Sequence, residues 1–207
     1  MSTEFASAGL TAGQLNAIVK KLGGHDMALR FLRDELSVSE LILTRPWREE
    51  DGVIYFSVTS DGMTGEDWIT RLEGKGFRMG DYAKQVLRSP GFKPTNGVTT
   101  EVAVLKGMIL EENDRTTKKI RAEAARRTLV KPSAELACLI REKFTDKEIE
   151  AMGLWRIVAM HEPINDSDDD LDLLRADLSD DCRWLGAYYG RPDSRLDRGS
   201  GFAFAVS

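Results

Sequence analysis

The chain has 207 residues, of which 42% are hydrophobic and 30% charged, so it can bury a core and is expected to be ordered. A formal net charge of -5 argues against a dedicated nucleic-acid-binding protein, and two cysteines exclude a disulfide framework. No stretch reaches the ~18 apolar residues of a membrane span and no basic, apolar leader begins the chain, so we expect a cytoplasmic protein without a membrane partner.

The N-terminal part is predicted to form a helical hairpin over 11–36. Thr11 and Gln14 fit a capping box at the start of its first helix, and the glycine pair at 23–24 separates this helix from the next. The second helix carries mixed charge, which favours a hairpin that covers part of the core over a DNA-reading helix-turn-helix. The predicted domains are a helical hairpin at 1–46 and an α+β domain at 47–207.

Strands and helices alternate in the middle of the chain. The run from Gly52 to Thr59 is β-rich and apolar at both parities, as in a central strand whose two faces are both covered. Thr64 and Asp67 form a second capping box, so a helix follows this strand. Three further elements are predicted: a helix over 80–88, a strand over 99–110 and a basic helix over 113–127.

The next region is predicted to hold a helix from Ser133, a short helix over 145–152 that begins with a Thr145–Glu148 capping box, and a strand over 154–164. An acidic stretch follows, in which Asp166, Asp168, Asp170 and Asp172 alternate. Carboxylates at this spacing can encircle calcium, but leucine stands at 171, where the EF-hand pattern requires glycine. A solvated acidic loop over 166–172 is therefore favoured over a calcium site.

The C-terminal segment is the most informative part of the sequence. Two apolar and aromatic runs, Arg183–Tyr189 and Gly201–Val206, flank a polar stretch over 190–200. This pattern is typical of a β-hairpin or a sheet edge with a long loop. Because burying so many charges would be costly, we expect an exposed loop with Trp184 and Phe202 buried beneath it.

A loop that is held between rigid strands is well suited to recognition. Tyr and Arg side chains supply large contact areas and directional hydrogen bonds at interfaces. We therefore predict a binding module for a protein or other macromolecular ligand, with its recognition loop at 186–200. The predicted contact residues are Tyr188, Tyr189, Arg191, Asp193, Arg195 and Arg198.

Two alternative functions stay open. A strand–loop–helix could hold a phosphate or carboxylate in a small-molecule enzyme, although it lacks the Walker and dinucleotide glycine spacings; its residues are Ser60, Gly62, Thr64 and Gly65. The basic helix over 113–127 could follow nucleic-acid phosphates, although a solvated helix face is favoured. Its cations are Arg115, Lys118, Lys119, Arg121, Arg126 and Arg127.

Catalytic and metal chemistry find little support in the sequence. His161 and Glu162 are adjacent in a predicted strand, so their side chains point to opposite faces and cannot form an acid–base pair. Two histidines without matching cysteine spacing argue against zinc, and no GxSxG elbow marks a nucleophile. We predict a binding protein rather than an enzyme, with no catalytic residues, metal or cofactor.

Two resemblances add to this interpretation. Runs that begin at Gly52, Lys93 and Glu142 resemble a set of uncharacterised hypothetical proteins from uncultured bacteria, including candidate-phylum lineages. That resemblance spans nearly the whole chain and brings no known activity. The second resemblance is local to the C-terminal segment.

Pro192 and Arg195, followed by Gly201 and Phe202, resemble the end of the C-type-lectin-like fold. That fold occurs in relatives of the formylglycine-generating enzyme and in the variable proteins of diversity-generating retroelements. The resemblance implies a fixed skeleton that carries interchangeable residues in the loop. The upstream Gly-Gly-Ser-Trp motif is absent here, and the usual Gly-Phe-Arg ending reads Gly-Phe-Ala.

These observations together predict an α+β fold. It would combine an N-terminal helical hairpin, a mixed β-sheet flanked by helices, and a C-terminal β-hairpin with C-type-lectin-like character.

Overall fold

The computed structural model describes residues 11–35, 45–178 and 184–207. The chain divides into two compact units, Met1–Thr44 and Arg45–Ser207. The first unit contains α1 (Ala12–Lys21) and α2 (His25–Leu32). Ala28 is the only buried residue of these two helices, and Leu15 and Leu32 are exposed.

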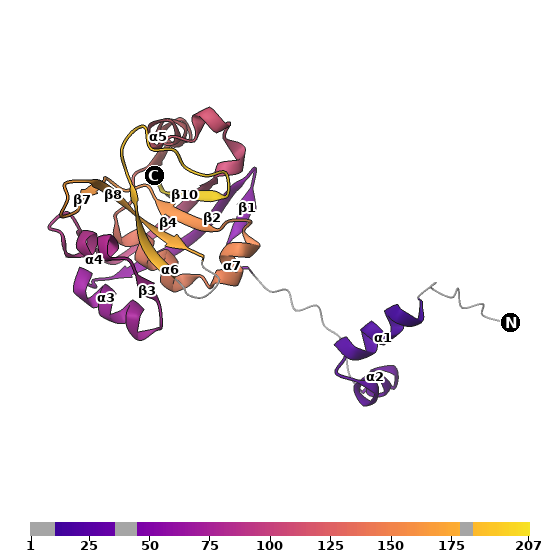
Figure 1. Cartoon of the computed structure of the whole chain (residues 1–207). Coiled ribbons are helices and arrows are strands. Elements are labelled where there is room, and N and C mark those ends of the chain that lie inside the picture. The colour runs from indigo at the N-terminus through magenta and orange to yellow at the C-terminus, as the bar shows by residue number, and fades with distance from the viewer. Residues whose placement is uncertain (1–10, 36–44, 179–183) are drawn as a thin grey trace. The chain divides into compact units, whose positions relative to one another are not determined.

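The second unit is an α+β domain built on one mixed sheet, which confirms the predicted fold class (Figure 1). The strands lie in the order β1-β2-β4-β10-β6-β8-β9-β3, with β5 beside β10 and β7 beside β8. The β10–β6 and β3–β9 pairs are parallel, and the other pairs are antiparallel. The strand bounds are β1 Arg48–Glu50, β2 Val53–Asp61, β3 Arg78–Met79, β4 Asn96–Lys106, β5 Leu129–Val130, β6 Arg156–Ala159, β7 Ile164–Asn165, β8 Leu171–Asp177, β9 Trp184–Tyr189 and β10 Ser200–Val206.

Helices cover both faces of this sheet (Figure 1). On one face, Trp68, Val86 and Ile140 of three helices join the larger core cluster with the sheet residues. On the other face, Ile120 packs with Leu196 and the aromatic side chains of β10 in a second cluster. The helix bounds are α3 Gly65–Gly74, α4 Asp81–Arg88, α5 Thr117–Arg126, α6 Glu135–Lys143 and α7 Asp146–Ala151.

Three helix starts that the sequence predicted are confirmed. Capping boxes begin α1, α3 and α7, at Thr11, Thr64 and Thr145. At α3, Thr64 Oγ1 accepts a hydrogen bond from the Asp67 amide (3.2 Å), and Asp67 Oδ2 accepts one from the Thr64 amide (3.0 Å). These bonds satisfy amides that a helix start leaves without partners.

The predicted C-terminal β-hairpin is wrong. The strand β9 pairs with β8 and β3, whereas β10 pairs with β4, β6 and β5, so the two segments do not pair with each other. The strand β10 lies in the middle of the sheet and is buried from Ser200 to Phe204. An uninterrupted run of apolar and small residues suits such a position, because both faces of a central strand are covered.

The strand β2 corrects a second prediction. It lies next to the edge strand β1 rather than at the centre. Both faces are covered at Val53 and Ile54, but further along Ser57, Thr59 and Asp61 are exposed. Both faces of β2 are therefore covered only over its first half, and the second half leaves one face open to solvent.

The acidic stretch also differs from its prediction. Only 166–170 form a turn, and the next seven residues form β8, a buried strand in the interior of the sheet. The apolar residues Leu173, Leu174 and Ala176 are fully buried there. The sequence pattern did not predict this strand because acidic residues surround its apolar ones. Asp172, predicted to be solvated, is buried in this strand.

The polar stretch over 190–200 is largely exposed, as predicted, and its charged side chains face solvent. Leu196 is buried in the second core cluster, and Gly190 and Ser200, at the two ends of the stretch, are buried as well. Phe202 is fully buried, but Trp184 is only half-buried and lies beneath the Arg78 guanidinium group at 6.0 Å. The expected burial of Trp184 is therefore wrong, because β9 lies near the edge of the sheet.

Candidate functional site

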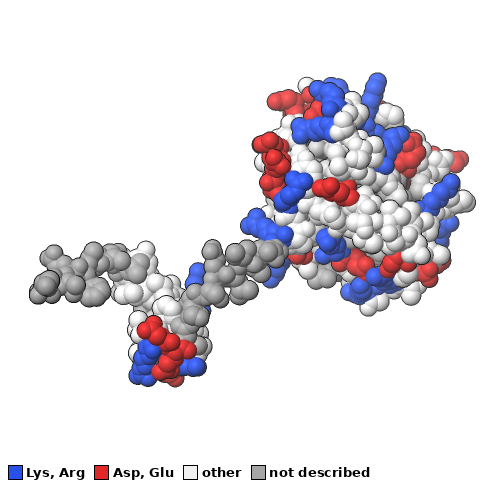
Figure 2. Space-filling view, turned by 180° about the vertical axis from the view of Figure 1, so that it is seen from behind, with Lys and Arg blue, Asp and Glu red and all other residues white. Residues whose placement is uncertain are grey.

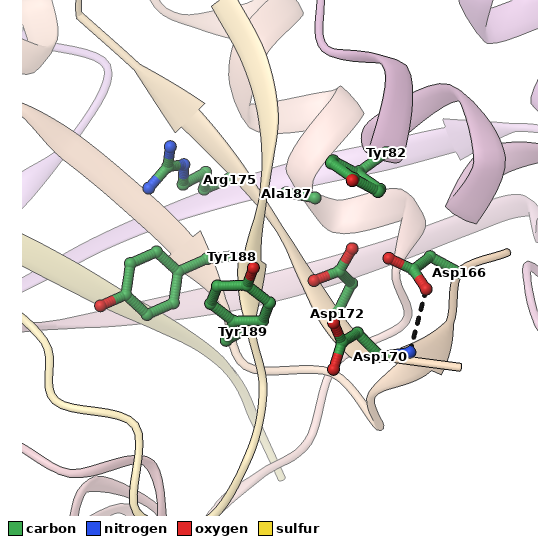
Figure 3. Close-up of a pocket in the computed structure, with 8 residues that line it drawn as sticks. All are labelled: Tyr82, Asp166, Asp170, Asp172, Arg175, Ala187, Tyr188 and Tyr189. Atoms are coloured by element: carbon green, nitrogen blue, oxygen red, sulfur yellow. Dashed lines mark hydrogen bonds between the residues drawn. The ribbon is translucent and has the colours of Figure 1, made fainter. Parts of the chain in front are cut away.

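A pocket of about 290 Å³ lies between α4, the β7–β8 turn and β9 (Figure 3). Asp172 of β8 faces it and is paired across the strands with Tyr189 of β9. Tyr82 of α4 lies above Asp172, and Asp166 and Asp170 of the turn lie beside it. The remaining lining residues are Arg175, Ala187 and Tyr188.

Asp172 is the unusual residue of this pocket. Only 4% of it is exposed, and its carboxylate takes part in none of the hydrogen bonds or ion pairs between described residues, although the charge of Arg175 stabilises its ionised form. Burial, followed by the negative charges of Asp166 and Asp170, raises its pKa to about 6. A buried carboxylate without a partner is costly, so this group favours a cation that can enter the pocket.

The turn that carries the other acids is rigidly held. Asp166 Oδ1 accepts hydrogen bonds from the amides of Asp168 (2.8 Å) and Asp170 (2.9 Å). Gln85 of α4 accepts one from the Ser167 amide (2.9 Å), which ties the turn to the helix. The pocket is therefore preformed by contacts within the chain rather than assembled by a ligand.

The electrostatic balance of the pocket is negative. Arg175 forms an ion pair with Asp177, and Arg191 forms one with Asp170, so both cations near the pocket are already matched. The nearby charge of Asp168 also raises the pKa of the Tyr82 hydroxyl. Aromatic faces beside uncompensated carboxylates provide the surroundings that ammonium and guanidinium groups prefer.

A second hollow of about 330 Å³ adjoins the first along Asp170 and Tyr189. Arg191, Asp193 and Ser194 of the C-terminal loop complete its lining. The Arg191 guanidinium group also lies 5.9 Å from the centre of the Tyr189 ring. Four of the six predicted contact residues therefore lie at these two adjoining hollows: Tyr188, Tyr189, Arg191 and Asp193.

The loop reaches this position because it is fastened to the start of α5. The Thr117 amide donates to the Ser194 carbonyl (3.1 Å), and the Lys118 amide donates to the Pro192 carbonyl (2.9 Å). The Leu196 amide donates in turn to a carbonyl just before α5 (2.8 Å). These bonds give an exposed loop a defined shape, which recognition requires.

The other two predicted contact residues lie elsewhere. The Arg195 carbonyl accepts a hydrogen bond from the Tyr188 hydroxyl, which fixes the loop, while the Arg195 side chain is exposed. Arg198 lines a separate pocket with Lys106 and Met108. The structure does not bring these two arginines to the site around Asp172.

The residues of the alternative anion site have partners within the chain. Ser60 is buried and accepts hydrogen bonds from the Thr95 hydroxyl (2.8 Å) and the Val98 amide (3.2 Å). Gly65 packs against Leu87 so closely that a Cβ atom would lie 1.8 Å from the Leu87 carbonyl oxygen. The remaining loop residues are Gly62, at a positive φ of 83°, and Thr64, which caps α3.

Most cations of the basic helix also have partners within the protein. Arg126 and Arg127 pair with Glu123, and Lys119 pairs with Asp114. Arg121 donates to the His161 carbonyl (2.6 Å), and Arg115 donates to the Leu110 carbonyl (3.0 Å). On the face drawn in Figure 2, positive and negative side chains are interspersed rather than gathered into a basic surface.

The residues at the end of β6 contribute to the fold. His161 is buried, accepts a hydrogen bond from the Leu174 amide at Nε2 (2.9 Å) and lies 2.7 Å from the Glu162 carbonyl through Nδ1. Burial lowers its pKa to about 4, so it stays neutral. Over the described ranges, no three His, Cys, Asp or Glu side chains are grouped to hold a metal ion.

Sequence reasoning grouped Asp166, Asp170 and Asp172 only as a calcium loop that it did not favour, and it missed Tyr82 and the pocket that these residues line. The signal that could have found Asp172 is an aspartate inside a run of leucines, a position that acids seldom occupy without a function.

In the part of the chain that the structure describes, no helix has the length and apolar character needed to cross a membrane. No family model matches the chain, and neither a curated protein nor a solved structure matches it.

Proposed function

We propose that the protein is a binding module that recognises an ammonium or guanidinium group of its ligand in the pocket around Asp172. The observation that carries this proposal is the buried Asp172 carboxylate, which faces the pocket without a partner. A cation placed there would relieve the cost of burying the charge. Tyr82 and Tyr189 would contact the same cation through their aromatic faces.

The C-terminal loop extends this site and supports recognition of a ligand larger than one side chain. Tyr189 and Arg191 connect the two hollows, and the bonds between the loop and α5 hold Arg191 and Asp193 beside them. A preformed site loses less conformational entropy when the ligand binds. The proposed contacts are therefore Asp172, Tyr82, Tyr189, Arg191 and Asp193.

The test is an NMR titration of the whole chain with Nα-acetyl-lysine methylamide. The neutral isostere Nα-acetyl-norleucine methylamide serves as the control ligand. We expect Asp172→Asn to weaken binding of the lysine compound at least about tenfold, because the charge pair is lost. Asp169→Asn is the matched control variant, because Asp169 lies on the same turn and is exposed.

The pH dependence provides a second check. Protonation of Asp172 removes the charge that binds the cation, so affinity should fall as the pH is lowered through about 6. The Asp172→Asn variant should show no such change. Equal affinity of the lysine and norleucine compounds, or full binding by Asp172→Asn, would overturn the proposed function.

A further inference from the structure

We propose that the ligand of the Asp172 pocket is an extended polypeptide segment that adds to the edge of β9 as a further strand and places a Lys or Arg side chain beside Asp172. This inference rests on the proposed function, since the cationic group is the same. It adds the class of molecule that carries the cation and the way in which its backbone is held.

The first observation is an open strand edge. The strand β3 pairs only with Trp184 and Leu185 at the start of β9. The Gly80 amide then donates to the Leu185 carbonyl (3.0 Å), after which the chain turns into α4. Among the described residues, no strand lies beside Ala187–Tyr189 on this side.

The direction of the backbone groups follows from this hydrogen bond. The carbonyl of Leu185 points away from β8, and groups two residues apart along a strand point the same way. The amides and carbonyls of Ala187 and Tyr189 therefore point outward at the open edge. The alternate groups face β8, as the bond from the Gly190 amide to the Leu171 carbonyl shows. An edge of this kind is a template for a further strand.

The second observation is that the pocket adjoins this edge. Ala187 and Tyr189 line the pocket, and Tyr189 is opposite Asp172 in the β8–β9 register. In Figure 3, Asp172 and Tyr82 lie on one side of β9, and Tyr188 and Arg175 lie on the other. A side chain on the Tyr82 side of an added strand would reach Asp172 by passing Tyr189 or Ala187, and the small methyl group of Ala187 is the lesser obstacle.

The distances suit a long cationic side chain. Neighbouring strands lie about 4.8 Å apart, so an added strand would run roughly 10 Å from β8, which carries Asp172. The long flexible stems of Lys and Arg can bridge most of this distance along the sheet face. A short acidic or polar side chain would not reach, and an acidic one would be repelled by Asp166 and Asp172.

The third observation is that this edge lacks the usual protection. Exposed edges are commonly guarded by Lys, Pro, bulges or a covering element. Neither Ala187 nor Tyr189 is a Lys or a Pro or lies in a bulge, and Tyr189 is 57% exposed, although α4 packs against β9. Tyr82, 49% exposed, presents a second aromatic ring beside it. An open edge with exposed aromatic rings and a negative pocket suits a basic strand better than any other class of partner.

The experiment uses the full chain, isotopically labelled, and a pool of N-acetylated heptapeptides with a fixed central Lys and Thr or Val elsewhere. We expect the best peptides to bind at least about tenfold more tightly than Nα-acetyl-lysine methylamide, because backbone pairing adds to the charge pair. The amides of Ala187 and Tyr189 should become protected from hydrogen exchange. Those of Gly186 and Tyr188, which face β8, are the internal controls.

Backbone N-methylation of the best peptide tests the strand geometry without changing the protein. Methylation of the peptide amides that face β9, which belong to every second residue, should abolish binding. Methylation of the intervening amides, which face away from β9, should leave the affinity within about twofold. Ala187→Pro, which removes an outward amide, should reduce binding of the best peptide at least about tenfold. A melting curve verifies that this variant is folded.

The outcomes separate the two proposals. If the lysine compound binds through Asp172 but no peptide binds more tightly, the pocket takes a small cation and the strand inference fails. If peptides bind tightly without dependence on methylation parity, they bind in another conformation and the inference also fails. If neither the lysine compound nor any peptide binds, the proposed function itself fails.

Discussion

At the scale of single residues, Asp172 is where burial and charge conflict most. The residue is buried, with its carboxylate facing the pocket, and two neighbouring aspartates add to the electrostatic cost of ionising it. An isolated protein keeps such a group only at a cost in stability, and binding sites are where this cost is commonly found. The same residue therefore links the stability of the domain to its proposed ligand.

The sign of this linkage gives a prediction. The folded-state pKa of Asp172, about 6, lies above the unfolded value of ~3.9. Below about pH 4 the carboxyl group is protonated in both states, so its burial does not lower the free energy of unfolding. This destabilisation grows as the pH rises from 4 to 6 and reaches its full size above pH 6. Asp172→Asn should raise the free energy of unfolding at pH 7.5 by about 1–2 kcal/mol and flatten its change between pH 4 and 6.

Urea unfolding of the wild type and the variant across this pH range measures the effect. Asp169→Asn, on the exposed turn, should change the free energy of unfolding by no more than about 0.5 kcal/mol. If Asp172→Asn is less stable than the wild type at pH 7.5, the carboxylate has a stabilising partner and the argument for an unsatisfied charge fails.

At the scale of elements, β9 and β10 show that the position of a strand in the sheet determines how much its aromatic residues contribute to stability. Both strands contain aromatic side chains, but β10 lies in the middle of the sheet and β9 lies near its edge. Phe202 is completely buried, whereas Trp184 is partly exposed. The free energy that each ring contributes should follow its burial.

Substitution of these two rings tests this difference. Phe202→Ala should lower the free energy of unfolding by about 3–5 kcal/mol, because it empties a buried site. Trp184→Ala should cost about 1–2 kcal/mol, because part of its ring already contacts solvent. Chemical denaturation compares the two variants, and a larger loss for Trp184→Ala would contradict this placement of the strands.

At the scale of the whole molecule, the two units differ in how much core each one holds. The helices of the first unit bury only Ala28, while the second unit contains both large core clusters. Short isolated helices are marginally stable in water, so the first unit contributes little folding free energy by itself. Folding of the second unit should depend on its own sheet and helices.

Deletion of residues 1–44 tests this conclusion. The shortened chain, Arg45–Ser207, should fold with a melting temperature within about 2 °C of the full chain, because its core clusters stay complete. It should also retain the affinity for Nα-acetyl-lysine methylamide. Differential scanning calorimetry and the NMR titration provide the two measurements, and an unfolded product would show that the first unit is part of the core.

The sequence by itself determined the local features of this protein. The capping boxes at Thr11, Thr64 and Thr145 could be predicted because their two partners lie three residues apart, whatever the rest of the chain does. The α+β class and the exposed charges of the C-terminal loop also follow from local pattern. Four residues that the sequence chemistry predicted as contacts, Tyr188, Tyr189, Arg191 and Asp193, line the two adjoining hollows, and their role in binding stays a prediction.

Only the tertiary structure decided which strands are neighbours. Two runs separated by a polar loop read as a hairpin, yet β6 and β8 lie between them, because long-range burial rather than loop length sets the strand order. The same choice buries Asp172 opposite Tyr189 and leaves the end of β9 open. The pocket also depends on α4, which is far from β8 and β9 in the sequence, so no local pattern could have assembled it.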